Sequence, residues 1–151
     1  MANTQAMCTS FKGELLVGHH NFGTGVVRAA TTADSFKAAL YLASATINAS
    51  TTAYTATGEV TGTGYTAGGV AVTNATAPAT SGTTAYWTPS ASITYTNVTL
   101  STAFDCVLIY NSTQSNKAVS VHTFGSQTVT AGTFTLTMPT NDASTGLIRL
   151  A

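Results

Sequence analysis

The chain has 151 residues, a formal net charge of zero and 7% charged residues, against roughly 25% in an ordinary soluble domain. Its five Lys and Arg residues are scattered, so no cation cluster is available for a phosphate backbone, and nucleic acid is not an expected partner. No run of about 18 apolar residues is present, which excludes a membrane-spanning helix.

The length predicts one domain, and 44% hydrophobic residues are enough to build its core. Thr makes up about one residue in five, a composition that favours strands. A surface with so little charge has weak self-repulsion and tends to associate. We therefore expect much of this surface to be covered by partners or by copies of the same chain.

The first segment predicts a short helix over Asn3–Val17. Its apolar residues Met7, Phe11 and Leu15 recur every four positions, which places them on one stripe. The stripe has two interpretations: it packs on the sheet of its own subunit, or it docks on a neighbouring protein as an assembly interface. The segment lacks the apolar block of a signal peptide, so we expect synthesis and folding in a cytoplasm.

Two adjacent histidines, His19 and His20, follow in a loop. Neighbouring residues of an extended chain point to opposite sides, and Glu14 is the only acid nearby. This set of ligands is incomplete for a metal. We expect solvated loop histidines and no metal site.

The first strong strand is expected at Phe36–Leu42. A long glycine-rich connection follows, with no Lys-Ser/Thr pair of a phosphate loop, so its glycines indicate turns and close backbone approaches. We expect its acid, Glu59, to bond backbone groups or Tyr65 rather than to catalyse. The next strands are expected at Val70–Asn74 and Thr83–Thr88.

The fold is expected to be organised around a hairpin over Phe104–Phe124. Phe104–Tyr110 is almost continuously apolar, as in a strand covered on both faces. Asn111–Asn116 contains residues that bond their own backbone and predicts a turn. Ala118–Phe124 alternates like a half-buried strand and completes an antiparallel pair.

Further strands are expected on either side of this hairpin, at Ile93–Leu100, Thr128–Thr130, Thr133–Met138 and Leu147–Ala151. Short strands at regular spacing predict an all-β fold, a mostly antiparallel sandwich or open barrel of seven to eight strands with one N-terminal helix. The chain divides into an N-terminal helix and arm, residues 1–35, and a β-sandwich domain, residues 36–151, within one compact unit.

No motif for catalysis is present, and we expect no catalytic, cofactor-binding or metal-binding residues. Cys106 and His122 are the one tempting nucleophile and base, but burial in an apolar strand raises the pKa of a thiol and blunts it. Cys8 and Cys106 are expected to be reduced structural thiols, with a disulfide between them as the alternative. Trp87 is expected in the core.

Several segments together resemble small structural proteins of tailed bacteriophages. The resemblance covers about Phe36 to Ala151, and it is carried by four stretches: FKAALYL at 36–42, YTATGEVTGTGYTAGG at 54–69, VLIYN at 107–111 and AGTFTLTMP at 131–139. It implies a virion component, a decoration (cement) protein on the capsid exterior that binds the major capsid protein and copies of itself.

The resemblance and the composition together lead us to expect a homo-oligomer, a trimer, with Met7, Phe11 and Leu15 at its interface. Two alternatives stay open. One is a subunit of the tail or of a fibre. The other is a small carbohydrate-binding module for host adhesion, in which Tyr86 and Trp87 would stack on a sugar.

Overall fold

The computed structural model describes residues 3–8, 11, 15, 19–20, 22–23 and 33–150. These residues form eight strands: β1 (Ala6–Met7), β2 (Phe36–Leu42), β3 (Val70–Val72), β4 (Ala79–Ser81), β5 (Thr84–Trp87), β6 (Ile93–Asn111), β7 (Lys117–Leu136) and β8 (Ile148–Leu150). The expectation of a mostly β fold is confirmed.

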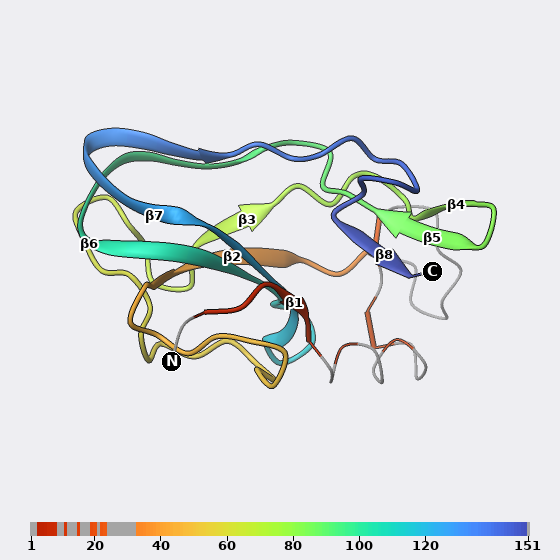
Figure 1. Cartoon of the computed structure of the whole chain (residues 1–151), viewed down its shortest axis with the longest axis horizontal. Coiled ribbons are helices and arrows are strands. Elements are labelled where there is room, and N and C mark those ends of the chain that lie inside the picture. Colours follow the sequence, from red (N-terminus) through yellow and green to blue (C-terminus); the bar gives the residue numbers. More distant parts are fainter. Residues whose placement is uncertain are drawn as a thin grey trace.

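The strands belong to two antiparallel sheets (Figure 1). The larger sheet has the order β1-β7-β6-β2-β3, and the smaller has the order β4-β5-β8. β6 and β7 form the predicted central hairpin, in which Leu108 pairs with Val121. β2 lies beside β6, the central strand of the larger sheet, and pairs with β6 on one side and β3 on the other.

The hairpin is longer than predicted because β6 and β7 each continue through polar segments where the sequence predicts a break between two strands. β6 has 19 residues and joins the expected strands Ile93–Leu100 and Phe104–Tyr110. β7 has 20 residues and joins three expected strands, ending at Leu136. The pairing continues through register shifts between Tyr95 and Cys106, where Asn97 has a positive φ of 54°. The polar gaps are therefore bulges within strands rather than breaks between them.

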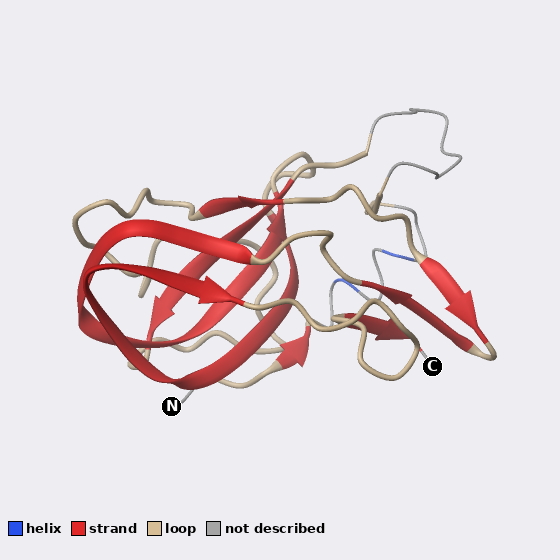
Figure 2. Ribbon diagram, turned by 90° about the horizontal axis from the view of Figure 1, so that it is seen from above, coloured by secondary structure: helices blue, strands red, loops and turns tan. Residues whose placement is uncertain are grey.

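These bulges let the hairpin fold back over its own sheet. Phe134, near the end of β7, packs against Phe104 at 5.0 Å and Phe124 at 5.3 Å between ring centroids. Tyr95, opposite Phe134, donates its hydroxyl to the carbonyl of Ala38 on β2 at 2.8 Å. Figure 1 shows the returning half of the hairpin above β2, and Figure 2 shows the same bend from above.

The opposite face of the larger sheet is covered by the loop of residues 43–57. Tyr41 donates its hydroxyl to the carbonyl of Thr55 at 2.6 Å, and the ring of Tyr54 stacks on that of Tyr110 at 5.0 Å. Gly69 lies where a Cβ atom would collide with the carbonyl oxygen of Ala38, which confirms a close backbone approach. The larger sheet is thus covered on both faces, as its apolar sequence predicts.

The predicted N-terminal helix over Asn3–Val17 is wrong at its start. Ala6–Met7 is the strand β1, which pairs with Ser120 and Val121 of β7. Phe11 and Leu15 each have helical backbone conformation, but the part of the chain that the structure describes contains no helical element. The other positions between residues 9 and 17 lie outside the described residues.

Asn3 explains why a strand forms here. Instead of capping a helix, its side chain accepts the N–H of Ile47 at 3.0 Å and donates to the carbonyl of Leu42 at 3.0 Å. It also donates to Asp105 Oδ1 at 2.5 Å. Hydrogen bonds to the sheet edge and to this loop therefore outweigh the weak helix preference of a short segment.

The expected core residues occupy the interior or its border. Trp87 is buried as expected, with 2% of its surface exposed. Six of the nine apolar strand residues that the sequence pattern places in the core are buried: Phe36, Leu40, Ile93, Val107, Ile109 and Val121. Leu42, Phe134 and Leu136 are half-buried and pack against this core.

Candidate functional site

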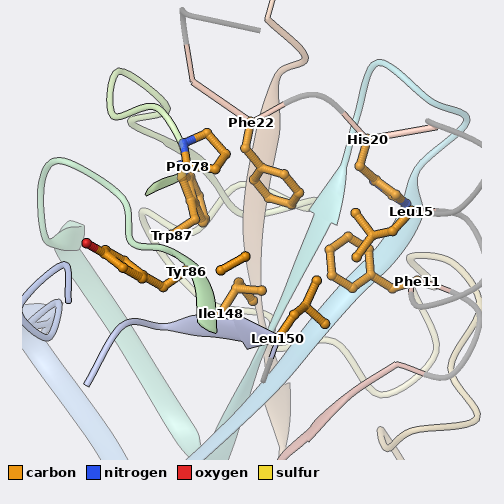
Figure 3. Close-up of a pocket in the computed structure, with 10 residues that line it drawn as sticks. Phe11, Leu15, His20, Phe22, Pro78, Tyr86, Trp87, Ile148 and Leu150 are labelled. Atoms are coloured by element: carbon orange, nitrogen blue, oxygen red, sulfur yellow. The ribbon is translucent and has the colours of Figure 1, made fainter. Parts of the chain in front are cut away.

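An apolar pocket lies between the N-terminal segment and the smaller sheet (Figure 3). Its cavity has a volume of about 200 Å³. The N-terminal segment contributes Phe11, Leu15, His20 and Phe22, and the other wall is formed by Pro78, Ala85, Tyr86, Trp87, Ile148 and Leu150. This pocket is smaller than the roughly 300–1,000 Å³ of typical drug-sized ligand sites.

Aromatic rings hold the N-terminal side of this pocket in place. Phe22 stacks on Phe36 with ring centroids 4.8 Å apart and packs against Trp87 at 4.7 Å. Phe11 meets Phe22 edge-on at 5.8 Å. Trp87 donates its indole N–H to the carbonyl of Thr76 at 2.8 Å. Because its ring is buried and its N–H is used, Trp87 is a core residue of the chain.

The three residues predicted for an assembly interface occupy different positions. Phe11 is completely buried among the rings of its own subunit. Leu15 is half-buried and lines the pocket beside Leu150, a large apolar residue with 41% of its surface exposed. Met7 is half-buried on β1 and does not line the pocket. The structure therefore brings Phe11 and Leu15 together and leaves Met7 apart.

A buried polar cluster fixes the N-terminal segment to the tip of the central hairpin. Asn111 Nδ2 donates to Asp34 Oδ2 at 2.8 Å and lies 3.2 Å from His20 Nδ1. Asn111 Oδ1 accepts the backbone N–H groups of Thr113 and Gln114, each at 3.1 Å. Those two bonds orient the amide, so Nδ2 is the donor and His20 Nδ1 is the acceptor.

This cluster corrects the expectation for the histidines. His19 is exposed, as predicted, but His20 is buried with 8% of its surface exposed. It packs edge-on against Phe11 at 4.7 Å. The burial arises because Asn111 and Phe11 provide both a polar and an apolar partner, which the local sequence does not show. The described residues contain no group of three potential metal ligands.

Glu59 organises the glycine-rich loop, as expected from the sequence. Its Oε1 accepts the Tyr65 hydroxyl at 2.8 Å and the Gly68 N–H at 2.7 Å, and its Oε2 accepts the Tyr54 hydroxyl at 2.6 Å. Burial, with the bond to Glu59, raises the pKa of Tyr54 to about 12. Burial likewise raises the pKa of Tyr65 far above its usual value. The carboxylate is thus a structural acceptor with its lone pairs in use.

Cys106 and His122 do not form a nucleophile–base pair. Cys106 pairs with Thr123 while His122 pairs with Val107, so the two side chains lie on opposite faces of the sheet. Burial raises the pKa of Cys106 to about 12. His122 Nε2 lies 2.8 Å from the hydroxyl of Ser120, but Ser120 is nearly fully buried, with 2% of its surface exposed. Cys8 and Cys106 are not joined by a disulfide.

The returning half of the hairpin presents an uncharged ribbon, residues 93–104 and 124–136. It contains no Asp, Glu, Lys or Arg. Its exposed positions are mostly small polar residues: Thr94, Thr96, Asn97, Ser101, Thr102, Ser126, Gln127, Thr128, Thr130, Thr133 and Thr135. Such a surface can make hydrogen bonds to a partner without the cost of desolvating charges.

Sequence reasoning missed Asn111 and Asp34 as members of a buried cluster. Asn111 stands at the end of an apolar strand, where it has the appearance of an ordinary turn residue. In the structure it is the last residue of β6 and has no exposed surface, which no local sequence pattern indicates. Among the described residues, no helix is long and apolar enough to cross a membrane. Comparisons of the chain with protein-family models, curated proteins and solved structures gave no match.

Proposed function

We propose that this protein is a structural protein of a tailed-bacteriophage virion that decorates and stabilises the outer capsid. Its partners are the major capsid protein and copies of itself, assembled as a trimer. It acts on the capsid exterior after synthesis in the host bacterial cytoplasm. It uses no cofactor and performs no catalysis.

The uncharged ribbon is the observation that carries this proposal. Its two strands expose mainly Thr and Ser, and no charged residue occurs between Lys117 and Asp142. A free monomer gains little solubility from such a surface, whereas an arrayed protein makes many weak polar contacts with it. Many copies on one particle add these weak contacts together.

The resemblance of residues 36–151 to phage structural proteins supports the same class of function. The segments that carry it form β2, the glycine-rich loop and parts of β6 and β7, which are central parts of the fold. The resemblance therefore concerns segments that build the framework. The proposal places attachment on the surfaces around that framework.

For the three-fold contact, we propose the surface around Leu15 and Leu150, and we propose Met7, which lies apart on β1, as a second contact point. Leu15 and Leu150 line one apolar pocket, and Leu150 is the most exposed large apolar side chain described. Burying one such side chain fully contributes roughly 1.5–3 kcal/mol. Phe11 supports this surface from beneath, since it is buried within its own subunit.

A density map of the particle that carries the protein tests the proposal. We expect copies of the β-domain on the outer capsid at three-fold or quasi-three-fold positions, with the N-terminal segment near the symmetry axis. Density in the tail or in a fibre instead would establish the alternative of a tail or fibre subunit. Absence from the particle would overturn the proposal altogether.

The carbohydrate-binding alternative has less support. The aromatic platform it requires includes Trp87, which is 2% exposed and bonded to Thr76. Tyr86 remains half-buried at the pocket. A glycan array, together with Trp87 fluorescence during sugar titration, distinguishes the two functions. Sugar-dependent quenching would favour adhesion, and an unchanged spectrum is expected for a decoration protein.

A further inference from the structure

We propose that the outer edge of β7 over residues 132–136, termed here the open β7 edge, pairs antiparallel with the same edge of a second copy. β7 has β6 on one side along its whole length. On its other side, β1 pairs with Ser120 and Val121, Cys8 donates its N–H to the carbonyl of Val119, and Ala118 donates its N–H to the carbonyl of Thr52. Beyond these residues, the described part of the chain provides no strand partner for this side.

The open β7 edge has the regular geometry that strand addition requires. Ile93, Thr94 and Tyr95 pair in succession with Leu136, Thr135 and Phe134, without a register shift. The next register shift, between Tyr95 and Val98, lies opposite Phe134 and Gly132 and places its extra residue on β6, so β7 itself carries no inserted residue there. Residues 132–136 of β7 therefore supply about five residues for a new pairing, which is the usual length of a strand.

The other side of this half of the hairpin is already covered. Thr99 on β6 donates its N–H to the carbonyl of Thr63 at 2.9 Å. The backbones of Gly62 and Gly64 lie so close to Thr99 and Asn97 that a Cβ atom at either glycine would collide with them. The glycine-rich loop therefore covers the β6 side at Asn97 and Thr99, whereas the described residues place no strand on the β7 side.

The charge pattern indicates that the occupant is a second copy. Two identical edges that pair antiparallel bring each side chain close to its own counterpart, so any charge in the segment would meet a like charge. Natural edge strands use Lys or Pro to prevent this pairing. No charged residue stands between Lys117 and Asp142, and no Pro stands between Pro89 and Pro139. The open β7 edge thus lacks both features.

The side chains of this edge also suit self-pairing. Thr135 already lies 3.5 Å from Thr94, hydroxyl to hydroxyl, across the hairpin, and Thr–Thr pairs are favourable between strands. On the other face, Phe134, Leu136 and Met138 are half-buried and pack on the core. A second ribbon continuing the sheet would cover more of these apolar side chains. The contact has two-fold symmetry and is separate from the surface proposed around Leu15.

A matched pair of lysine variants tests the inference. Thr135 and Thr94 are cross-strand partners, and both are exposed. Thr135 stands on the open strand, whereas Thr94 stands on β6. In Thr135→Lys, the contact would bring two like charges onto one face of the sheet close to the two-fold axis. We expect the molar mass measured by light scattering to fall by half in Thr135→Lys and to stay unchanged in Thr94→Lys.

Hydrogen exchange of the unmodified protein provides a second measurement that needs no variant. Amide groups of residues 132–136 that pair between copies should exchange at least tenfold more slowly in concentrated than in dilute solution. Exchange independent of concentration would overturn the inference. The two-fold contact predicts an assembly of two copies, or of six copies where the proposed three-fold contact also forms. A wild-type assembly of one or three copies would therefore overturn the inference, as would an equal loss of mass in the Thr94→Lys control.

Discussion

Asn111 and His20 stand 91 positions apart in the chain, yet the side-chain amide of Asn111 donates to Nδ1 of His20 across 3.2 Å. The same amide donates to Asp34 and accepts two backbone N–H groups at the hairpin tip. One side chain therefore joins the turn of the central hairpin to the N-terminal segment. Its residue has no exposed surface, so water cannot replace the bonds that it makes.

We predict that Asn111→Ala destabilises the protein by at least about 1–3 kcal/mol, the cost of one unsatisfied buried polar group. The loss is measured by urea denaturation. Asn141→Ala is the control, because Asn141 Oδ1 is buried without a hydrogen-bond partner, so the substitution removes no bond from that atom. Release of the N-terminal segment should also change the emission of Trp87, which packs against Phe22. Equal stability of the two variants would contradict this role of Asn111.

The tyrosine hydroxyls around Glu59 give the second prediction. Tyr54→Phe and Tyr65→Phe each remove a hydrogen bond to the buried carboxylate, and bonds to charged groups contribute about 1.5–3 kcal/mol. We expect a loss of that order in the free energy of unfolding for each variant. Tyr86→Phe is the matched control, since its hydroxyl makes no hydrogen bond among the described residues and should change stability little.

His122 gives a prediction about pH. Burial lowers its pKa in the folded protein to about 4, below the ordinary value of 6.5. Between these values the unfolded chain binds a proton that the folded protein does not. Stability contributed by neutral His122 is therefore complete above about pH 6.5 and declines as the pH falls, by roughly 1.4 kcal/mol per pH unit, until about pH 4.

Denaturation across this pH range, compared between variants, measures the effect. His122→Asn should flatten the decline of stability between about pH 6.5 and pH 4. His19→Gln, which replaces an exposed histidine elsewhere in the chain, is the control. If the slope is the same in all three proteins, another group is responsible for the acid sensitivity.

The central hairpin and most of its buried positions were predictable because local alternation determines which face of a strand is apolar. The continuity of β6 was not predictable in this way. Ser101, Thr102 and Ala103 carry no apolar signal, and hydrogen bonds to β7 on either side keep the strand intact. The turn after Asn111 was also predictable, because its bonds to Thr113 and Gln114 are local.

The N-terminal segment and the buried polar cluster depend on long-range partners. Met7, Phe11 and Leu15 fit a helical stripe equally well whether or not a sheet edge is nearby. The segment starts as a strand rather than a helix because Ala6–Met7 pairs with β7. The paired residues of β7 lie more than a hundred positions further along the chain. Asp34 meets Asn111 across 77 positions. A spacing pattern within a short window carries no information about either contact.

The last prediction separates folding from assembly in the N-terminal segment. Phe11 is fully buried against His20 and Phe22, so Phe11→Asp places a charge among aromatic rings and should detach the segment. The loss of stability is limited to the free energy that holds this segment on the domain, because the segment can open locally. Leu15→Asp changes a half-buried residue at the pocket and should leave the thermal unfolding temperature nearly unchanged.

Both variants are compared for thermal unfolding, for oligomeric state by light scattering and for occupancy on capsids. We expect Leu15→Asp to weaken trimer formation or capsid attachment while the β-domain stays folded, because it places a charge on the apolar surface proposed for the three-fold contact. Phe11→Asp should reduce assembly and stability together. Normal assembly and normal occupancy of Leu15→Asp would show that the segment serves its own subunit alone, and the interface of Met7, Phe11 and Leu15 would then be wrong.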